Sequence, residues 1–310
     1  MRLMPTLFFW VCACSVILAQ EDHYTVVAQP GDGIFSLLRK QGLDPVKHYE
    51  EFIKLNSEKI KNGSLLQVGV GYEVPRAKDS FKKTGVVVQS KDGVEEPIFD
   101  SELAQMSLKS ETLKNAVYYL IVEDKKDINN GYAKGVTESL AAELMVHGAQ
   151  VYILGQEIPD SPELVEPLTE MQQMGNYIEA INKRYIQNTG KYQRVIVIRA
   201  VDVIAGSNTD VAVYHYNKSE QGQRLANNIE NVFKKNSVSN RTYEDVHLIF
   251  EDKENLYLAR NILPAISLIT LENASKKSKE KIAMQLDRKK FVNVLTNGIM
   301  NDYVDLEINE

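Results

Sequence analysis

Hydrophobic and polar positions in the first part of the chain follow a strand–helix–helix–strand order. Apolar residues alternate over 24–27 and again over 68–74, which predicts two strands. Between them, apolar residues at helical spacing predict helices over 34–41 and 45–56, and residues rich in Pro, Gly and Asn separate the elements. Residues 21–76 are therefore predicted to form a small βααβ domain.

The pattern changes in the second part of the chain. Residues 116–122 form a continuous apolar run, and 194–199 are similar, which is typical of strands covered on both faces. Such strands alternate with helical patterns up to a last helix over 288–303. This order predicts an α/β fold for residues 115–310, with three layers and a mostly parallel or mixed twisted sheet.

A polar segment connects the two predicted domains. Residues 77–114 mix charged and turn-forming residues, and we interpret them as a linker. Within it, Val86–Val88 and Glu95–Phe99 flank the turn signal Asp92–Gly93, which is compatible with a small hairpin.

The chain begins with a segment that has the pattern of an export signal. An apolar run over 3–19 follows Arg2 and ends before an acidic stretch, which predicts a signal peptide over residues 1–20. An uncleaved N-terminal anchor is the alternative, because the run is at the lower limit of a membrane span. Both cysteines, Cys12 and Cys14, lie in this segment, so we expect no disulfide and no thiolate metal site in the exported chain.

Composition narrows the classes of partner. The 310 residues include 36 Lys and Arg against 42 Asp and Glu, and the net charge is −6. This acidic balance argues against non-specific binding of nucleic acid or of an anionic membrane, since nothing attracts the chain to phosphate. It is compatible with a neutral glycan, and no nucleic-acid partner is expected.

The first domain resembles a LysM module over its whole length. That family opens with Y-x-V…GD and closes with N…G…(V/I)P, and the matching residues are Tyr24, Val26, Gly31, Asp32, Asn56, Gly69, Val74 and Pro75. One residue departs from the pattern, because Gly33 stands where the family usually has Thr. Asp32 is then the residue expected to cap the first helix.

The LysM resemblance implies a glycan-binding site. LysM modules bind glycans that contain N-acetylglucosamine, such as peptidoglycan, in a shallow groove at the loops before the helices. The contacts implied for this chain are Gly31, Asp32, Gly33, Ile34, Phe35, Leu55 and Asn56. A LysM-shaped spacer that binds no glycan is the alternative interpretation.

The second domain resembles the zinc-dependent N-acetylmuramoyl-L-alanine amidases of the amidase_3 type. The segments that carry the resemblance are Ala116–Tyr119, Glu138–Leu154, Arg194–Ile198, Asp210–Tyr216 and Pro264–Ile266. In that family His, Glu and His hold a zinc ion that activates water, and a further Glu is the general base.

The residues at those catalytic positions depart from the family pattern. Asp124 stands at the first His, Glu138 keeps the acidic ligand, Arg199 stands at the second His, and Ile269 stands at the general base. Arginine has no lone pair for a metal, so we expect no cofactor and no catalytic residues. Our hypothesis is that Arg199 bridges Asp124 and Glu138 and replaces the charge of the metal.

Three functions are compatible with these patterns. The first is a pseudo-amidase of the bacterial cell envelope or periplasm, which binds peptidoglycan and scaffolds or regulates envelope proteins. The second is an active amidase, with zinc held at a site rebuilt from Asp124, Glu138 and either His215 or Glu272. The third is an assembly component that binds only proteins.

Overall fold

The structure is a computed structural model, and part of the chain is described in it. The described residues are 23–60, 66–88, 95–123, 131–155, 169–201, 203, 207–238, 248–250, 252–273, 281–284 and 287–307. The predicted signal segment and Asp124 lie outside these ranges. None of the helices within them is both long enough and apolar enough to cross a bilayer.

The N-terminal unit has the predicted βααβ order. Its elements are β1 (His23–Val27), α1 (Ile34–Lys40), α2 (Pro45–Leu55) and β2 (Gly71–Pro75). The two strands pair antiparallel, with Val26 opposite Tyr72, and both helices pack on them around a small core. Val68, which the alternating pattern assigned to the second strand, lies before β2 and is 61% exposed.

The turn before α1 is closed by Asp32, which does not cap the helix. Gly33 occupies the N-cap, and Ser36 Oγ accepts a hydrogen bond from its backbone N–H at 2.9 Å. The expectation that Asp32 caps α1 is therefore wrong. Its carboxylate instead accepts from Gln29 N at 2.8 Å and from Lys40 Nζ at 2.6 Å. Burial raises the pKa of Asp32, but these hydrogen bonds outweigh it and hold the pKa below its usual range.

Asn56 fastens α2 to β2. Its side chain is 1% exposed, and Nδ2 donates to Phe52 O at 2.8 Å and to Glu73 O at 2.7 Å. Its Oδ1 accepts from Glu73 N at 2.8 Å. Asn56 thus satisfies backbone groups on both elements, which explains its place in the LysM-like pattern by folding alone.

The larger unit is built on a mixed, mostly parallel sheet, as predicted. The described strands run in the order β11-β8-β10-β7-β5-β6-β3-β4, with β9 beside β8. The five strands from β10 to β3 are parallel. β8 pairs antiparallel with β10 and β11, β4 pairs antiparallel with β3, and β9 pairs parallel with β8. Their bounds are β3 (Gly85–Val88), β4 (Glu95–Pro97), β5 (Ala116–Glu123), β6 (Gln150–Leu154), β7 (Tyr192–Val201), β8 (Thr209–His215), β9 (Leu248–Ile249), β10 (Ala265–Asn273) and β11 (Ile282–Met284).

The segment predicted as a linker contributes to this sheet. β3 pairs antiparallel with β4, as expected of a hairpin, and it also pairs in parallel with β6. The short helix α3 (Phe81–Thr84) leads into β3, and the 3-10 helix η1 (Leu103–Gln105) follows β4. The sheet therefore begins before residue 115. A run of three valines is too short for the sequence to show whether it is internal.

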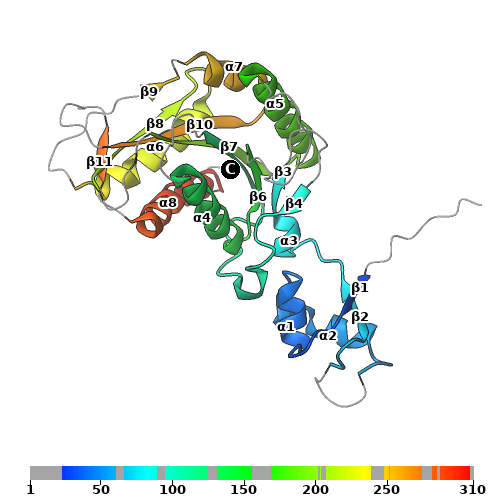
Figure 1. The fold of residues 1–310 in the computed structure, drawn as a ribbon. Helices are drawn as coiled ribbons and strands as arrows, with labels where there is room; N and C mark the ends of the chain where they lie inside the picture. Colours follow the sequence, from blue (N-terminus) through cyan, green and yellow to red (C-terminus); the bar gives the residue numbers. More distant parts are fainter. Residues whose placement is uncertain are drawn as a thin grey trace, which may run out of the picture.

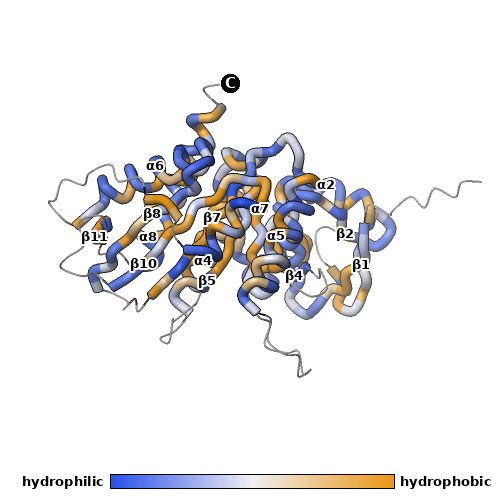
Figure 2. Tube along the Cα trace, turned by 90° about the horizontal axis from the view of Figure 1, so that it is seen from above, coloured by the Kyte–Doolittle hydropathy of each residue, from blue (hydrophilic) through white to orange (hydrophobic). Residues whose placement is uncertain are grey.

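Helices cover both faces of the sheet (Figure 1). α4 (Tyr132–Val146), α6 (Glu220–Lys235) and α8 (Arg288–Glu307) share one core with it, and we call this side the α4 face. α5 (Glu170–Gln187) and α7 (Lys253–Asn261) share a second core on the α5 face. Figure 2 shows the central strands as largely hydrophobic, as burial on both faces requires.

The two units meet where α1 ends. Phe81 N donates to Gly42 O at 2.8 Å, and Ser80 Oγ donates to Gln41 O at 2.7 Å. Gly42 has a φ of +71°, and a Cβ there would lie 2.9 Å from Lys82 N. Glycine is required at this junction both by the backbone conformation and by the close approach of α3.

We expect Asn56→Ala to lower the free energy of unfolding of the N-terminal unit by about 2–4 kcal/mol, because it leaves the backbone N–H and C=O of Glu73 without their partners. Urea unfolding followed by tyrosine fluorescence measures this loss. Asn261→Ala is the matched control, since Asn261 is exposed and its Nδ2 donates to Tyr257 O, within its own helix, at 2.7 Å. Equal effects of the two substitutions would contradict the role of Asn56.

Candidate functional site

Charged side chains gather where the parallel strands end. We call Glu123 of β5, Arg199 of β7, Glu272 of β10, Asp252 and Lys281 the strand-end cluster. The carboxyl ends of parallel strands share one edge of the sheet, and open α/β sheets bind ligands at this edge. It is also the edge at which the amidase resemblance places zinc.

Arg199 connects two acidic members of the strand-end cluster. It lies directly opposite Glu123 in the β5–β7 register, and its Nε and Nη2 donate to Glu123 Oε2 at 2.7 and 2.6 Å. Asp252 Oδ2 is 3.7 Å from the same Nη2. The Glu123 side chain is 4% exposed, and no described residue forms a hydrogen bond with its Oε1. A guanidinium paired with a buried carboxylate thus occupies this strand end.

The expected bridge from Arg199 to Glu138 is wrong. Side chains alternate along a strand, and Ile198 and Ala200 belong to the core of the α4 face. Arg199 therefore points to the α5 face, whereas Glu138 lies on α4, which covers the opposite face. The ion pairs of Arg199 with described residues are those with Glu123 and Asp252. The Asp124 half of the bridge lies outside the described residues.

The position that the amidase resemblance assigns to the general base lies inside the core. Ile269 is 0% exposed and lies in the middle of β10, opposite Ile198 of β7, in the core of the α4 face. Glu272, three residues further on, points to the α5 face and is paired with Lys281. A shift from Ile269 to Glu272 would thus exchange the two faces of the strand, as the sequence predicts.

His215 lies far along the sheet from the strand-end cluster. β8 runs antiparallel to β10, and His215 is opposite Ser267, whereas Asp210 is opposite Glu272. Five residues of strand separate these two levels, which is roughly 17 Å. His215 therefore does not join Glu272 in one metal site. Within the described ranges, no three His, Cys, Asp or Glu side chains are placed to hold a metal ion together.

The glycan contacts implied by the LysM resemblance divide into surface and interior residues. Gly31 and Phe35 are exposed, and Gly33 is partly exposed at the start of α1. Phe35 is 45% exposed and packs against Tyr49, with ring centroids 5.6 Å apart. Asp32 and Leu55 are partly buried. The two remaining residues are in the interior and only 1% exposed, namely Ile34 and Asn56.

Two loops that the sequence separates form one edge of the N-terminal unit. Ala28 N donates to Val70 O at 3.0 Å, and Gly69 N donates to Ala28 O at 2.9 Å. We call residues 28–33 and 66–70 together the loop edge. Its exposed apolar residue Val68 was missed by sequence reasoning, because the alternation that continues into β2 assigned it to a strand.

The fold and the cluster define an α/β protein with a mixed, mostly parallel sheet and an arginine–glutamate pair at the carboxyl ends of its central strands. No family model matches the sequence, and no curated protein matches it. Among solved structures, the CwlD amidase from Clostridioides difficile in complex with the GerS lipoprotein is similar, with 14% identity, a TM-score of 0.38, and coverage of 61% of this chain and 98% of that chain.

Two further solved structures are similar at the same level. The N-acetylmuramoyl-L-alanine amidase AmiC2 of Nostoc punctiforme has 16% identity and a TM-score of 0.34, with 64% of this chain and 98% of that chain covered. A putative carboxypeptidase A from Shewanella denitrificans has 10% identity and a TM-score of 0.39, with 64% and 60% covered. Similarities at these TM-scores assign no activity to this chain.

We expect Arg199→Met to lower the free energy of unfolding by about 3 kcal/mol, because it leaves the buried Glu123 carboxylate without its cation. The double variant with Glu123→Gln should recover most of that loss, since the remaining amide carries no charge. Urea unfolding of the two single variants and the double variant gives the coupling energy. Additive effects would show that the pair is not a unit.

Proposed function

We propose that this chain is a non-catalytic, peptidoglycan-binding protein of the bacterial cell envelope. The observation that carries the proposal is the pair of Arg199 with the buried Glu123, at 2.6–2.7 Å, at the strand end where the amidase resemblance implies a histidine ligand of zinc. The export signal that the sequence predicts over residues 1–20 and its LysM resemblance over 21–76 support the location and the ligand.

The chemistry of this pair argues against a zinc site there. Guanidinium stays protonated in proteins and has no lone pair, so Arg199 neither binds nor tolerates a second cation at close range. Ile269 argues against hydrolysis in addition. It stands at the position of the general base, where no carboxylate is present to take a proton from water.

The N-terminal unit is the proposed glycan-binding module. Phe35, in the first turn of α1, is 45% exposed, and Val68, in the loop edge, is 61% exposed, so both present apolar surface to a ligand. Sugar rings have apolar faces that pack on such side chains and hydroxyls that bond to backbone groups. Peptidoglycan, or another glycan that contains N-acetylglucosamine, is the proposed ligand.

The larger unit is the proposed scaffold. Without hydrolytic residues, an amidase-shaped domain retains a surface that holds peptide stems or other envelope proteins. Envelope proteins are therefore the proposed second class of partner, and the domain would place them next to the glycan that the first unit binds.

Metal content and amide release test the absence of catalysis. We expect the purified protein to contain no stoichiometric zinc and to release no peptide from peptidoglycan, with or without added Zn²⁺, because Arg199 and Ile269 cannot replace a ligand and a base. A zinc amidase assayed in parallel is the positive control. Stoichiometric zinc together with released peptide would mean that the protein is an active amidase.

Binding to purified sacculi tests the glycan site. We expect Phe35→Ala to reduce the bound fraction at least about fivefold, since it removes the exposed ring in the first turn of α1. Tyr257→Ala is the matched control, because Tyr257 is similarly exposed at 39% but lies on α7 of the other unit. If the wild-type chain does not bind sacculi at all, the protein is an assembly component that binds other proteins.

A further inference from the structure

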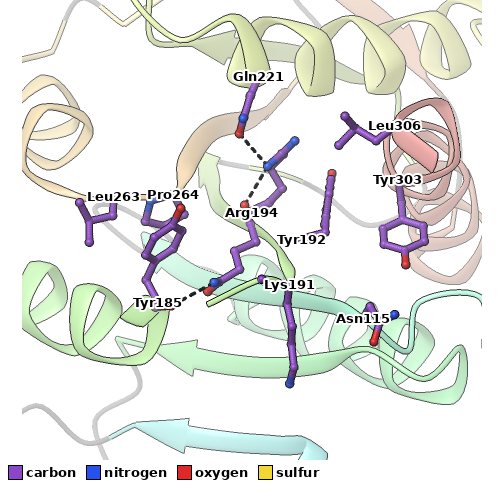
Figure 3. A pocket seen from close by; sticks show the side chains of 12 residues that line it. Asn115, Tyr185, Lys191, Tyr192, Arg194, Gln221, Leu263, Pro264, Tyr303 and Leu306 are labelled. Atoms are coloured by element: carbon purple, nitrogen blue, oxygen red, sulfur yellow. Dashed lines mark hydrogen bonds between the residues drawn. The ribbon is translucent and has the colours of Figure 1, made fainter. Parts of the chain in front are cut away.

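A pocket opens at the edge of the sheet opposite the strand-end cluster. It has a volume of about 440 Å³ and lies where β7 and β10 begin (Figure 3). This volume is within the range of small-ligand sites. Its walls combine aromatic and apolar side chains with one arginine and one lysine, and no described lining residue is acidic; they include Tyr185, Lys191, Arg194, Gln221, Leu263 and Tyr303.

Arg194 is the buried cation of this pocket. Its side chain is 3% exposed, and its guanidinium lies 4.1 Å from the centre of the Tyr192 ring. Nη1 donates to Gln193 O at 2.9 Å and to Gln221 Oε1 at 3.1 Å, as Figure 3 shows. Nη2 has no hydrogen-bond acceptor among the described residues. A buried charged N–H group without an acceptor costs free energy, which an incoming acceptor would recover.

The charges around Arg194 leave an excess of positive charge. Asp302 is 0% exposed and accepts from Arg194 Nε at 3.3 Å, from Arg224 Nε at 2.6 Å and from the Tyr192 hydroxyl. One carboxylate therefore accepts from two guanidinium groups, and in the part of the chain that the structure describes Nη2 of Arg224 also has no acceptor. The exposed Glu220 lies outside the pocket lining. Among the described residues, this network therefore has two guanidinium groups and one carboxylate, and the Arg224 side chain is 33% exposed.

Gln221 marks the position that a ligand oxygen would take. It belongs to the first turn of α6, a helix of 16 residues whose N-terminal dipole favours an anion. Gln221 is exposed, so the hydrogen bond from Arg194 Nη1 is the main interaction that holds its amide oxygen in place. A carboxylate in its place would bring the missing charge and two oxygens, which match the fork of a guanidinium.

We propose that this pocket binds the terminal carboxylate of a short peptide. The carboxylate displaces Gln221 from Arg194 and bonds to both Nη atoms, and the body of the peptide packs against Tyr185, Leu263 and Tyr303. These aromatic and apolar side chains favour a peptide over an inorganic anion, because a peptide has apolar groups that pack against them. The site is separate from the loop edge and from the strand-end cluster, so the inference does not depend on the proposed function.

Titration calorimetry of the purified protein tests the ligand class. The probes are N-acetyl-Ala-Ala in its L,L and D,D forms, the C-terminal amide of each, and inorganic phosphate. We expect at least one free acid to bind at least tenfold more tightly than its amide and than phosphate. Preference for the D,D acid indicates a cell-wall stem peptide as the source, and preference for the L,L acid indicates a protein C-terminus. Equal binding of acid and amide, or no binding of either acid at millimolar concentration, would overturn the proposal.

Two variants of the exposed Gln221 test the geometry without disturbing the core. Gln221→Glu places a carboxylate of the protein on Arg194, so we expect a higher melting temperature and at least a tenfold loss of acid affinity. Gln221→Ala clears the same position, and its acid affinity should equal or exceed that of the wild type. An unchanged affinity in Gln221→Glu would show that the ligand does not bind at Arg194.

Discussion

Burial of the central strands on both faces is the constraint from which the rest of the structure follows. Because neither face of β5, β7 or β10 meets solvent, polar side chains are largely confined to the ends of these strands. The strand ends then carry the charges, with Arg199 and Glu123 at one edge and Arg194 at the other. The packing that keeps charged side chains out of the middle of the strands also removes water from those at the strand ends. Each of these charges therefore requires a specific partner.

The sequence predicts the architecture well, because its signals are periodic. The run over 116–122 identifies a doubly covered strand, and the βααβ order of the first unit follows from alternation and helical spacing. Short segments cannot be predicted in this way, because they are too short to show a period. Val86–Val88 carries no period from which to assign it to the interior of the sheet, and Val68 continues the alternation of β2 although the strand begins later.

The candidate site was less predictable, because it depends on which face each side chain occupies. Alignment to a family pattern relates Arg199 to Glu138 by position, whereas strand alternation separates them across the sheet. Glu123 is adjacent in sequence to the position that the alignment selects, yet it is the residue that meets Arg199 in the register. The buried carboxylate Asp302 lies on a helix far along the chain, and no local pattern connects it with Arg194.

The two arginines of β7 also favour one register of that strand over its alternatives. Arg194 and Arg199 are five residues apart, so they point to opposite faces of a strand of 10 residues. A slip of one residue would exchange their faces and separate both from their carboxylates, and a slip of two would draw one guanidinium into the apolar interior. Ion pairs at both ends of β7 thus favour its observed register. β5 and β10 pair with β7, so their register depends on it.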